Sequence, residues 1–203
     1  MKIICIGRNY TDHAKEMASP VPDKPVFFLK PDTALLRNNQ PFFYPLFSND
    51  IHHEVEVVVK INRLGRNIAE KFAHRYYNEI ALGIDFTARD LQAECKQKGL
   101  PWEMSKAFDG AAPISQFVDI NKFDNLSNLK FWLDVNDKTV QKGSISEMIF
   151  SIDKLIAYVS QFITLKIGDL IYTGTPAGVG PVKIGDRLKA YLEGELMLDF
   201  FVR

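Results

Sequence analysis

Cysteine and net charge are both scarce in this chain of 203 residues. Its only two cysteines, Cys5 and Cys95, form no CxxC motif. One possible pair in a chain of this length is no disulfide framework, so two reduced thiols in a cytoplasmic protein are expected. Lys plus Arg number 25 and Asp plus Glu number 25. This balance gives no electrostatic reason to expect binding to nucleic acid or to an anionic membrane.

Long hydrophobic runs are missing as well. The apolar stretch Ile3–Ile6 is too short for the core of a signal peptide. No other run approaches the roughly 20 apolar residues that cross a bilayer. Hydrophobic residues make up 46% of the chain and charged residues 25%, the ordinary globular mixture. We therefore expect one domain over residues 1–203, with no membrane partner.

Short strand-like segments dominate the chain, and only a few segments show helical periodicity. Strands are predicted at 3–6, 26–30, 54–61, 80–86, 128–136, 139–141, 169–174, 188–192 and 196–202. Helices are predicted at 12–17, with Thr11 or Asp12 as cap, and at 68–77, 87–98 and 151–162. Nothing alternates in βαβ fashion, so a doubly wound sheet is disfavoured. The prediction is an α+β fold that is mostly β, with mixed, mainly antiparallel strands.

The most informative feature is a pair of acids two residues apart, Glu54 and Glu56, in a valine-rich run. Alternate residues of a strand point to one face and lie roughly 6.6–6.8 Å apart. A third acid, Asp85, lies near the end of the predicted strand 80–86. Three converging carboxylates repel one another unless a cation lies between them, and oxygen ligands favour a hard divalent ion. The alternative is an ordinary half-exposed antiparallel strand.

His13 and Glu16 form a second candidate site near the N-terminus. Residues three apart on a helix share a face, so the two side chains can touch. A carboxylate beside an imidazole raises its basicity and fixes its tautomer, as a general base requires. The alternative is a solvated helical turn with one incidental pair.

Two further segments carry groups that could act on an anion. Lys106 stands among apolar and small residues, where it could pair with the acids or with an anionic substrate, or lie in an exposed loop. The glycine-rich segment Gly174–Gly180 could present backbone N–H groups and the Thr175 hydroxyl to an anion. It could equally be a tight turn between strands.

Taken together, five ordered motifs resemble the fumarylacetoacetate hydrolase family. They are Arg8-Asn9-Tyr10 with His13 and Glu16, His53–Glu56, Asp85–Asp90, Ser105–Asp109 and Gly174–Gly180. The match runs along nearly the whole chain and is nearest to the short acylpyruvase and oxaloacetate decarboxylase members. The resemblance implies a fold built around a β-sandwich roll, a homodimer, and Mg²⁺ or Mn²⁺ at the site.

The resemblance also implies a role for each matching residue. Glu54, Glu56 and Asp85 match the metal-binding acids, and His13 with Glu16 matches the dyad that activates water. The positions expected to contact the substrate or the developing enolate are Arg8, Tyr10, Gln92, Lys106 and Thr175.

The expected reaction is metal-dependent cleavage of a C–C bond in a small 2-oxo acid. Hydrolysis of an acylpyruvate, such as fumarylpyruvate or acetylpyruvate, would give pyruvate and a carboxylic acid. Decarboxylation of oxaloacetate and isomerisation of a 2-oxo diacid use the same enolate, so the sequence separates the three poorly. A catalytically silent metal- or ligand-binding module is the alternative from another class. Residues 1–25 include a segment that could order over bound substrate as a lid.

Overall fold

A six-stranded mixed sheet forms the centre of the molecule. The computed structural model of the chain describes residues 1–17 and 20–203. The strand order in this sheet is β2-β1-β12-β5-β6-β9. Neighbouring strands are antiparallel except β1 and β12, which run parallel. Its strands are β1 (Ile3–Gly7), β2 (Val26–Lys30), β5 (Val55–Ile61), β6 (Tyr77–Ile84), β9 (Val118–Asp119) and β12 (Leu170–Tyr172).

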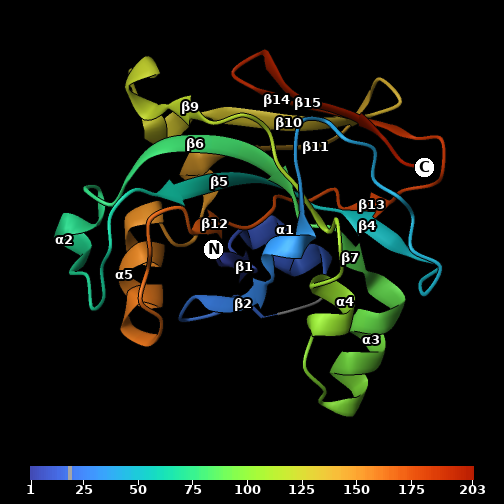
Figure 1. Cartoon of the computed structure of the whole chain (residues 1–203), viewed down its shortest axis with the longest axis horizontal. Helices are drawn as coiled ribbons and strands as arrows, with labels where there is room; N and C mark the ends of the chain where they lie inside the picture. The colour runs from blue at the N-terminus through green and yellow to red at the C-terminus, as the bar shows by residue number, and fades with distance from the viewer. Residues whose placement is uncertain (18–19) are drawn as a thin grey trace.

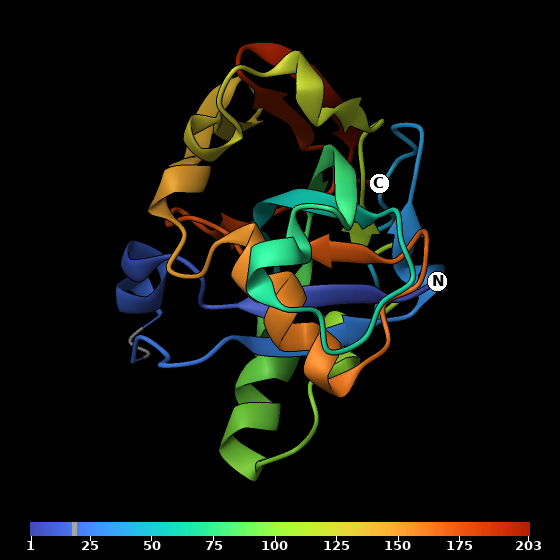
Figure 2. The same ribbon diagram turned by 90° about the vertical axis from the view of Figure 1, so that its left-hand side faces the viewer.

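A four-stranded antiparallel sheet, ordered β11-β10-β14-β15, lies against β5 and β6. It is the upper layer in both views of the molecule (Figures 1 and 2). Its strands are β10 (Lys130–Val135), β11 (Lys138–Ser144), β14 (Arg187–Leu192) and β15 (Glu195–Phe201). Asn136 and Asp137, between β10 and β11, have φ values of 53° and 63°, as a tight two-residue hairpin turn requires. The predicted hairpin and the α+β class are thus confirmed.

Two small sheets complete the β structure. One has the order β13-β4-β7, with β4 (Ile51–His53), β7 (Thr87–Ala88) and β13 (Gly180–Pro181). The other pairs β3 (Leu35–Leu36) with β8 (Ala112–Pro113) in parallel. The sheet β13-β4-β7 matters for the site, because β4 ends immediately before Glu54 and β7 begins two residues after Asp85.

The helices are few and short, and three of the predicted ones need correction. The α-helices of the structure are α1 (Thr11–Glu16), α2 (Glu70–Ala73), α3 (Arg89–Lys98), α4 (Glu103–Lys106) and α5 (Ile152–Phe162). The residue before α1 is Tyr10, and no side chain caps the helix there, so the predicted Thr11 or Asp12 cap is wrong. The helix predicted at 68–77 shrinks to one turn, since Tyr77 already belongs to β6. The third, α3, starts two residues late because Thr87 and Ala88 pair with β4.

The helices α3 and α4 lie side by side and extend from the sheets on the side opposite to the four-stranded layer (Figures 1 and 2). Gly99, with φ 64°, ends α3 in the left-handed conformation. At the other flank, α5 packs against α2, and the Ser151 hydroxyl accepts a hydrogen bond from Lys154 N as its cap. Among the described residues, no helix is long and apolar enough to cross a membrane.

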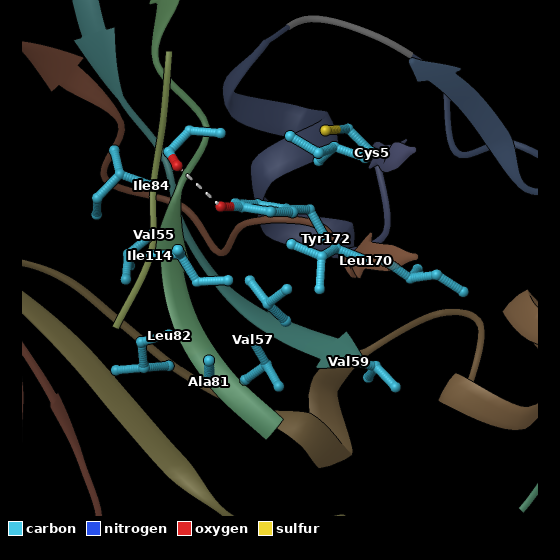
Figure 3. Close-up of a cluster of buried hydrophobic side chains, with 14 of the residues drawn as sticks. Cys5, Val55, Val57, Val59, Ala81, Leu82, Ile84, Ile114, Leu170 and Tyr172 are labelled. Atoms are coloured by element: carbon cyan, nitrogen blue, oxygen red, sulfur yellow. Dashed lines mark hydrogen bonds between the residues drawn. The ribbon is translucent and has the colours of Figure 1, made fainter. Parts of the chain in front are cut away.

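The core fills the space around β5, β6 and β12 (Figure 3). Val55, Val57 and Val59 are fully buried, so β5 is no half-exposed strand. Tyr172 lies among these residues, and its hydroxyl is 3.2 Å from Pro113 O. A Cβ atom on Gly83 would lie 2.5 Å from the Tyr172 ring, so glycine is required for this close approach. The packing fixes β5 against β6, and with them the residues at their ends.

Candidate active site

The three acids come together at one end of the β5–β6 pair. Glu54 immediately precedes β5, and the register places Val55 opposite Ile84 and Glu56 opposite Gly83. Asp85 N donates a hydrogen bond to Glu54 O over 2.8 Å, which continues the ladder by one residue. One carboxylate oxygen from each of Glu54, Glu56 and Asp85 lies within 4.8 Å of the others. The predicted convergence of the acids is present in the structure.

All three carboxylates are buried, with at most 5% of any residue exposed. Buried carboxylates need cationic or hydrogen-bonding partners, and two lysines supply them. Lys106 Nζ lies 2.9 Å from Glu54 Oε2, 2.9 Å from Asp85 Oδ2 and 2.5 Å from Thr87 Oγ1. Lys106 itself is 3% exposed, so it occupies no surface loop. It comes from the last position of α4, which packs against β7.

Lys30, at the end of β2, is a partner that the sequence did not reveal. Its ammonium lies 2.8 Å from Asp85 Oδ1. It also donates to the carbonyl oxygens of Phe86, Lys106 and Ala111. An ammonium has three N–H donors, and these three carbonyls use them. Asp85 Oδ1 therefore sits beside a positive charge but receives no hydrogen bond from the described residues.

The environment separates the pKa values of the two glutamates. Burial alone would raise the pKa of Glu54, but Lys106 and Arg89 outweigh it and hold that pKa well below its usual range. Arg89, at the start of α3, forms an ion pair with Glu54 Oε1. Burial raises the pKa of Glu56 well above its usual range, and the charges of Asp85 and Glu54 raise it further. A bound cation would favour the ionised form of all three groups.

The segment Gly174–Gly180 contributes backbone groups as well as a hydroxyl. Gly174 N donates a hydrogen bond to Glu56 Oε2 over 2.8 Å. The Thr175 hydroxyl donates to Val55 O over 2.9 Å, and its oxygen accepts from Gln141 Nε2 over 2.8 Å. Its single proton is thus used, so toward the cavity this hydroxyl offers an acceptor.

His13 and Glu16 make the predicted contact, over 3.3 Å between Nδ1 and Oε2. His13 is 6% exposed, so this is no solvated helical turn. The Glu16 carboxylate also accepts from Gly178 N, at 3.1 and 3.2 Å, which ties α1 to the glycine-rich segment. Because Glu16 holds Nδ1, the Nε2 atom of His13 is the nitrogen left for proton exchange with a substrate.

One cavity of about 300 Å³ brings most of these groups together. The predicted residues that line it are Arg8, His13, Glu54, Glu56, Asp85, Gln92, Lys106 and Thr175. Glu16 is not among the residues that line this cavity, but it contacts His13. Tyr10 lies elsewhere: it is 3% exposed and packs edge-on against Phe131. It borders a separate hollow with Pro176 and Ala177.

Sequence reasoning missed several residues that line or support the cavity. They are Phe28, Lys30, Thr87, Arg89, Lys96, Trp102 and Gln141. Arg89, Lys96 and Trp102 lie within or beside the motifs, but their type alone gave no role. Lys30 ends a strongly apolar strand, which is the one signal that could have pointed to a buried lysine.

The acids suit a divalent ion of the Mg²⁺ or Mn²⁺ type. All the donors are carboxylate oxygens, the ligands that such hard ions prefer. The donor set of three buried carboxylates therefore fits the ion.

Comparison with known proteins gives consistent matches over the whole chain. The family described as "Fumarylacetoacetate (FAA) hydrolase C-terminal" matches residues 2–199. The oxaloacetate tautomerase FAHD1, mitochondrial, of Bos taurus is 47% identical over 98% of this chain and 90% of its own length. The oxaloacetate decarboxylase, mitochondrial, of Dictyostelium discoideum is 44% identical over 100% and 94%.

A solved structure extends the comparison to the fold. The fumarylpyruvate hydrolase of Pseudomonas aeruginosa, in complex with Mn²⁺ and pyruvate, is 34% identical and has a TM-score of 0.94. The alignment covers 100% of this chain and 89% of that one. A family match of this extent, with relatives above 40% identity, fixes the evolutionary relationship of the chain.

Proposed function

Because the chain belongs to the fumarylacetoacetate hydrolase family, we propose that it catalyses enolate chemistry on a small 2-oxo diacid of the oxaloacetate type. Tautomerisation or decarboxylation is the proposed reaction. The observation that carries the proposal is the shared cavity, in which the His13–Glu16 pair and Lys106 line or border the same space as the acids. The names of the bovine and Dictyostelium relatives favour oxaloacetate over an acylpyruvate.

Glu54, Glu56 and Asp85 are the residues proposed to hold Mg²⁺ or Mn²⁺. When bound, such an ion supplies a Lewis acid that polarises the 2-oxo group and stabilises negative charge on its oxygen. The three carboxylates would hold that ion, while Lys106 and Arg89 hold Glu54 in place.

Lys106 is proposed to stabilise the enolate electrostatically. Burial opposes its charge, but Asp85 and Glu54 outweigh burial and raise the pKa of Lys106. A fixed cation in a buried site is effective where an oxyanion develops, since it needs no reorganisation.

His13 is proposed to move the proton. In tautomerisation the enol O–H proton leaves and C3 gains a proton, and Nε2 is placed for this exchange by the bond from Nδ1 to Glu16. In decarboxylation the C3–C4 bond breaks, CO₂ leaves, and the electron pair becomes the enolate of pyruvate. A proton delivered to C3 then gives pyruvate.

Acylpyruvate hydrolysis is the second candidate. It is favoured by the His13–Glu16 dyad, which could take a proton from water, and by the likeness to the Pseudomonas fumarylpyruvate hydrolase. The hydroxide would attack the distal carbonyl, and the enolate of pyruvate would leave.

The test is a substrate panel assayed with Mg²⁺ and with Mn²⁺. Loss of the oxaloacetate enol is followed by absorbance, and pyruvate formation by coupled reduction. Acetylpyruvate and fumarylpyruvate are assayed in parallel. We expect turnover of oxaloacetate that His13→Ala lowers at least about 100-fold, with oxalate binding retained. No turnover of any panel member, or equal behaviour of both proteins, would support a silent binding module instead.

Two further proposals concern the setting of the protein. A homodimer is proposed, and the exposed apolar side chains Phe43, Leu46 and Phe47 in one segment are consistent with a contact surface. Sedimentation of the purified protein tests it.

The cytoplasm is the proposed compartment, whereas the bovine and Dictyostelium relatives carry mitochondrial names. The lid segment includes residues 18 and 19, which lie outside the described residues.

A further inference from the structure

Four cationic side chains line the cavity, and only two of them have acidic partners. Arg89 pairs with Glu54, and Lys106 pairs with Glu54 and Asp85. Arg8 and Lys96 form no salt bridge with any acid in the part of the chain that the structure describes, although both line the cavity. Two cations without counterions in one cavity call for an anion from outside the protein.

The position of Lys96 on α3 separates it from the acids. Gln92 and Lys96 follow Arg89 by three and seven residues on this helix, and all three line the cavity. Seven residues of helix rise about 10 Å, and the Arg89 end is the one that contacts Glu54. Lys96 is exposed and its ammonium lies 5.8 Å from the Trp102 ring centre, so it lies at the rim of the cavity.

Arg8 lines the same cavity from another part of the chain. It follows β1 with φ 58°, a left-handed conformation that is strained for a non-glycine residue. Partial burial lowers the pKa of Lys96, and repulsion from Arg89, Lys106 and Arg8 lowers it further. Arg8, Arg89 and Lys106 line the same cavity as Lys96 and repel its charge, and a bound anion would relieve that repulsion.

We propose that Lys96, together with Arg8, binds the carboxylate of a 2-oxo diacid that is remote from the 2-oxo group. This inference rests on the proposed function, which places the 2-oxo end at Glu54, Glu56 and Asp85. The remote carboxylate then lies toward the rim, where Lys96 pairs with it. Lys96 is therefore a specificity-determining residue that selects dianionic 2-oxo acids over monoanionic ones.

The test compares two four-carbon 2-oxo acids that differ only in the remote carboxylate, oxaloacetate and 2-oxobutanoate. Binding with Mg²⁺ is measured by calorimetry in a His13→Ala background, so that turnover does not consume the ligand. Lys96→Gln is expected to raise the Kd of oxaloacetate about tenfold, because a charge-assisted pair is lost. The Kd of 2-oxobutanoate is expected to change less than about twofold.

The matched control is Lys98→Gln on the same helix. Lys98 pairs with Glu94 over 2.6 Å and is not among the cavity-lining residues, so its substitution should change neither Kd. An equal effect of Lys96→Gln on both acids, or no effect on either, would overturn the inference and leave the proposed function intact. Failure of both acids to bind the protein with Lys96 present would overturn both.

Discussion

Gln141 Nε2 donates a hydrogen bond to Thr175 Oγ1 over 2.8 Å, deep inside the protein. The same amide donates to Pro176 O over 3.0 Å, and its oxygen accepts from Val55 N over 3.0 Å. Gln141 belongs to β11 of the four-stranded sheet. Its partners are Val55, the first residue of β5, and two residues of the segment Gly174–Gly180. One side chain thus ties the second sheet to the walls of the cavity.

Gln141→Leu is expected to destabilise the protein by about 2–4 kcal/mol, because it leaves buried donors and acceptors without partners. Urea unfolding measures this. Gln116→Leu is the control, since the Gln116 amide makes its bond to Asn38 at the surface. Equal stability of the two variants would contradict the assignment of Gln141 as a tether.

Glu54→Gln is expected to weaken Mn²⁺ binding by at least about 100-fold. Loss of a residue that only hydrogen-bonds a metal ligand already costs about 10- to 100-fold in metal affinity, and loss of the ligand itself should cost more. Calorimetry with Mn²⁺ gives the affinity. Glu79→Gln on the adjacent strand β6 serves as the control, because Glu79 pairs with Lys60 away from the acids. Unchanged affinity in Glu54→Gln would refute its assignment as a ligand.

Glu16→Gln is expected to lower kcat about 10- to 100-fold with oxaloacetate, because the His13 ring loses the carboxylate that orients it. Steady-state kinetics at saturating Mg²⁺ provide the test. Asp12→Asn alters the same helix but only the exposed pair with Lys15, and should leave kcat unchanged. Normal kcat in Glu16→Gln would show that His13 needs no such partner.

Gly174→Ala and Gly185→Ala separate backbone strain from crowding. Both glycines have similar positive φ, 101° and 97°. A Cβ at Gly174 would lie 2.7 Å from Asn9 Cβ, whereas nothing lies within 4 Å of one at Gly185. Gly185→Ala should therefore cost about 1–2 kcal/mol from conformation alone. Gly174→Ala should cost more and should also weaken Mn²⁺ binding, since Gly174 N contacts Glu56.

Urea unfolding and calorimetry of the two glycine variants decide between these effects. The same stability loss in both, with unchanged Mn²⁺ affinity, would show that the segment adapts to the extra methyl group.

Asp90 is expected to make the stability of the protein depend on acid pH. Burial opposes its charge, but hydrogen bonds from the Ser48 hydroxyl and from Asn49 N and Leu91 N together outweigh it and lower its pKa below the ordinary 3.8. A lowered folded pKa means that the stabilisation is complete above the ordinary value. It is then lost as the pH falls through the folded value.

The measurement for Asp90 is urea unfolding of the wild type and Asp90→Asn between about pH 6 and pH 3. The variant should be less stable at the upper end, and the difference should narrow toward the lower end. A difference that stays constant with pH would exclude the carboxylate as its cause.

Sequence patterns predicted correctly which side chains come together where chemistry and local spacing coincide. The alternation around Glu54 and Glu56, the three-residue spacing of His13 and Glu16, and the ordered motifs all survive in the structure. These features depend on strand and helix geometry, which the local sequence encodes. The cap of α1 and the extent of α2 were wrong, because pairing and packing with distant segments decided them.

The sequence alone determined the family, the class of fold, and which acids and bases are candidates for the site. The tertiary structure decided which of their neighbours matter. Lys30, Gln141 and Lys96 come from three separate elements, and no local pattern names the partner of any of them. Only the folding of β2 beneath Asp85, of β11 behind Thr175 and of α3 along the cavity gives their charges and amides a specific partner or position. Such contacts join residues far apart in the chain, and a local sequence pattern does not record them.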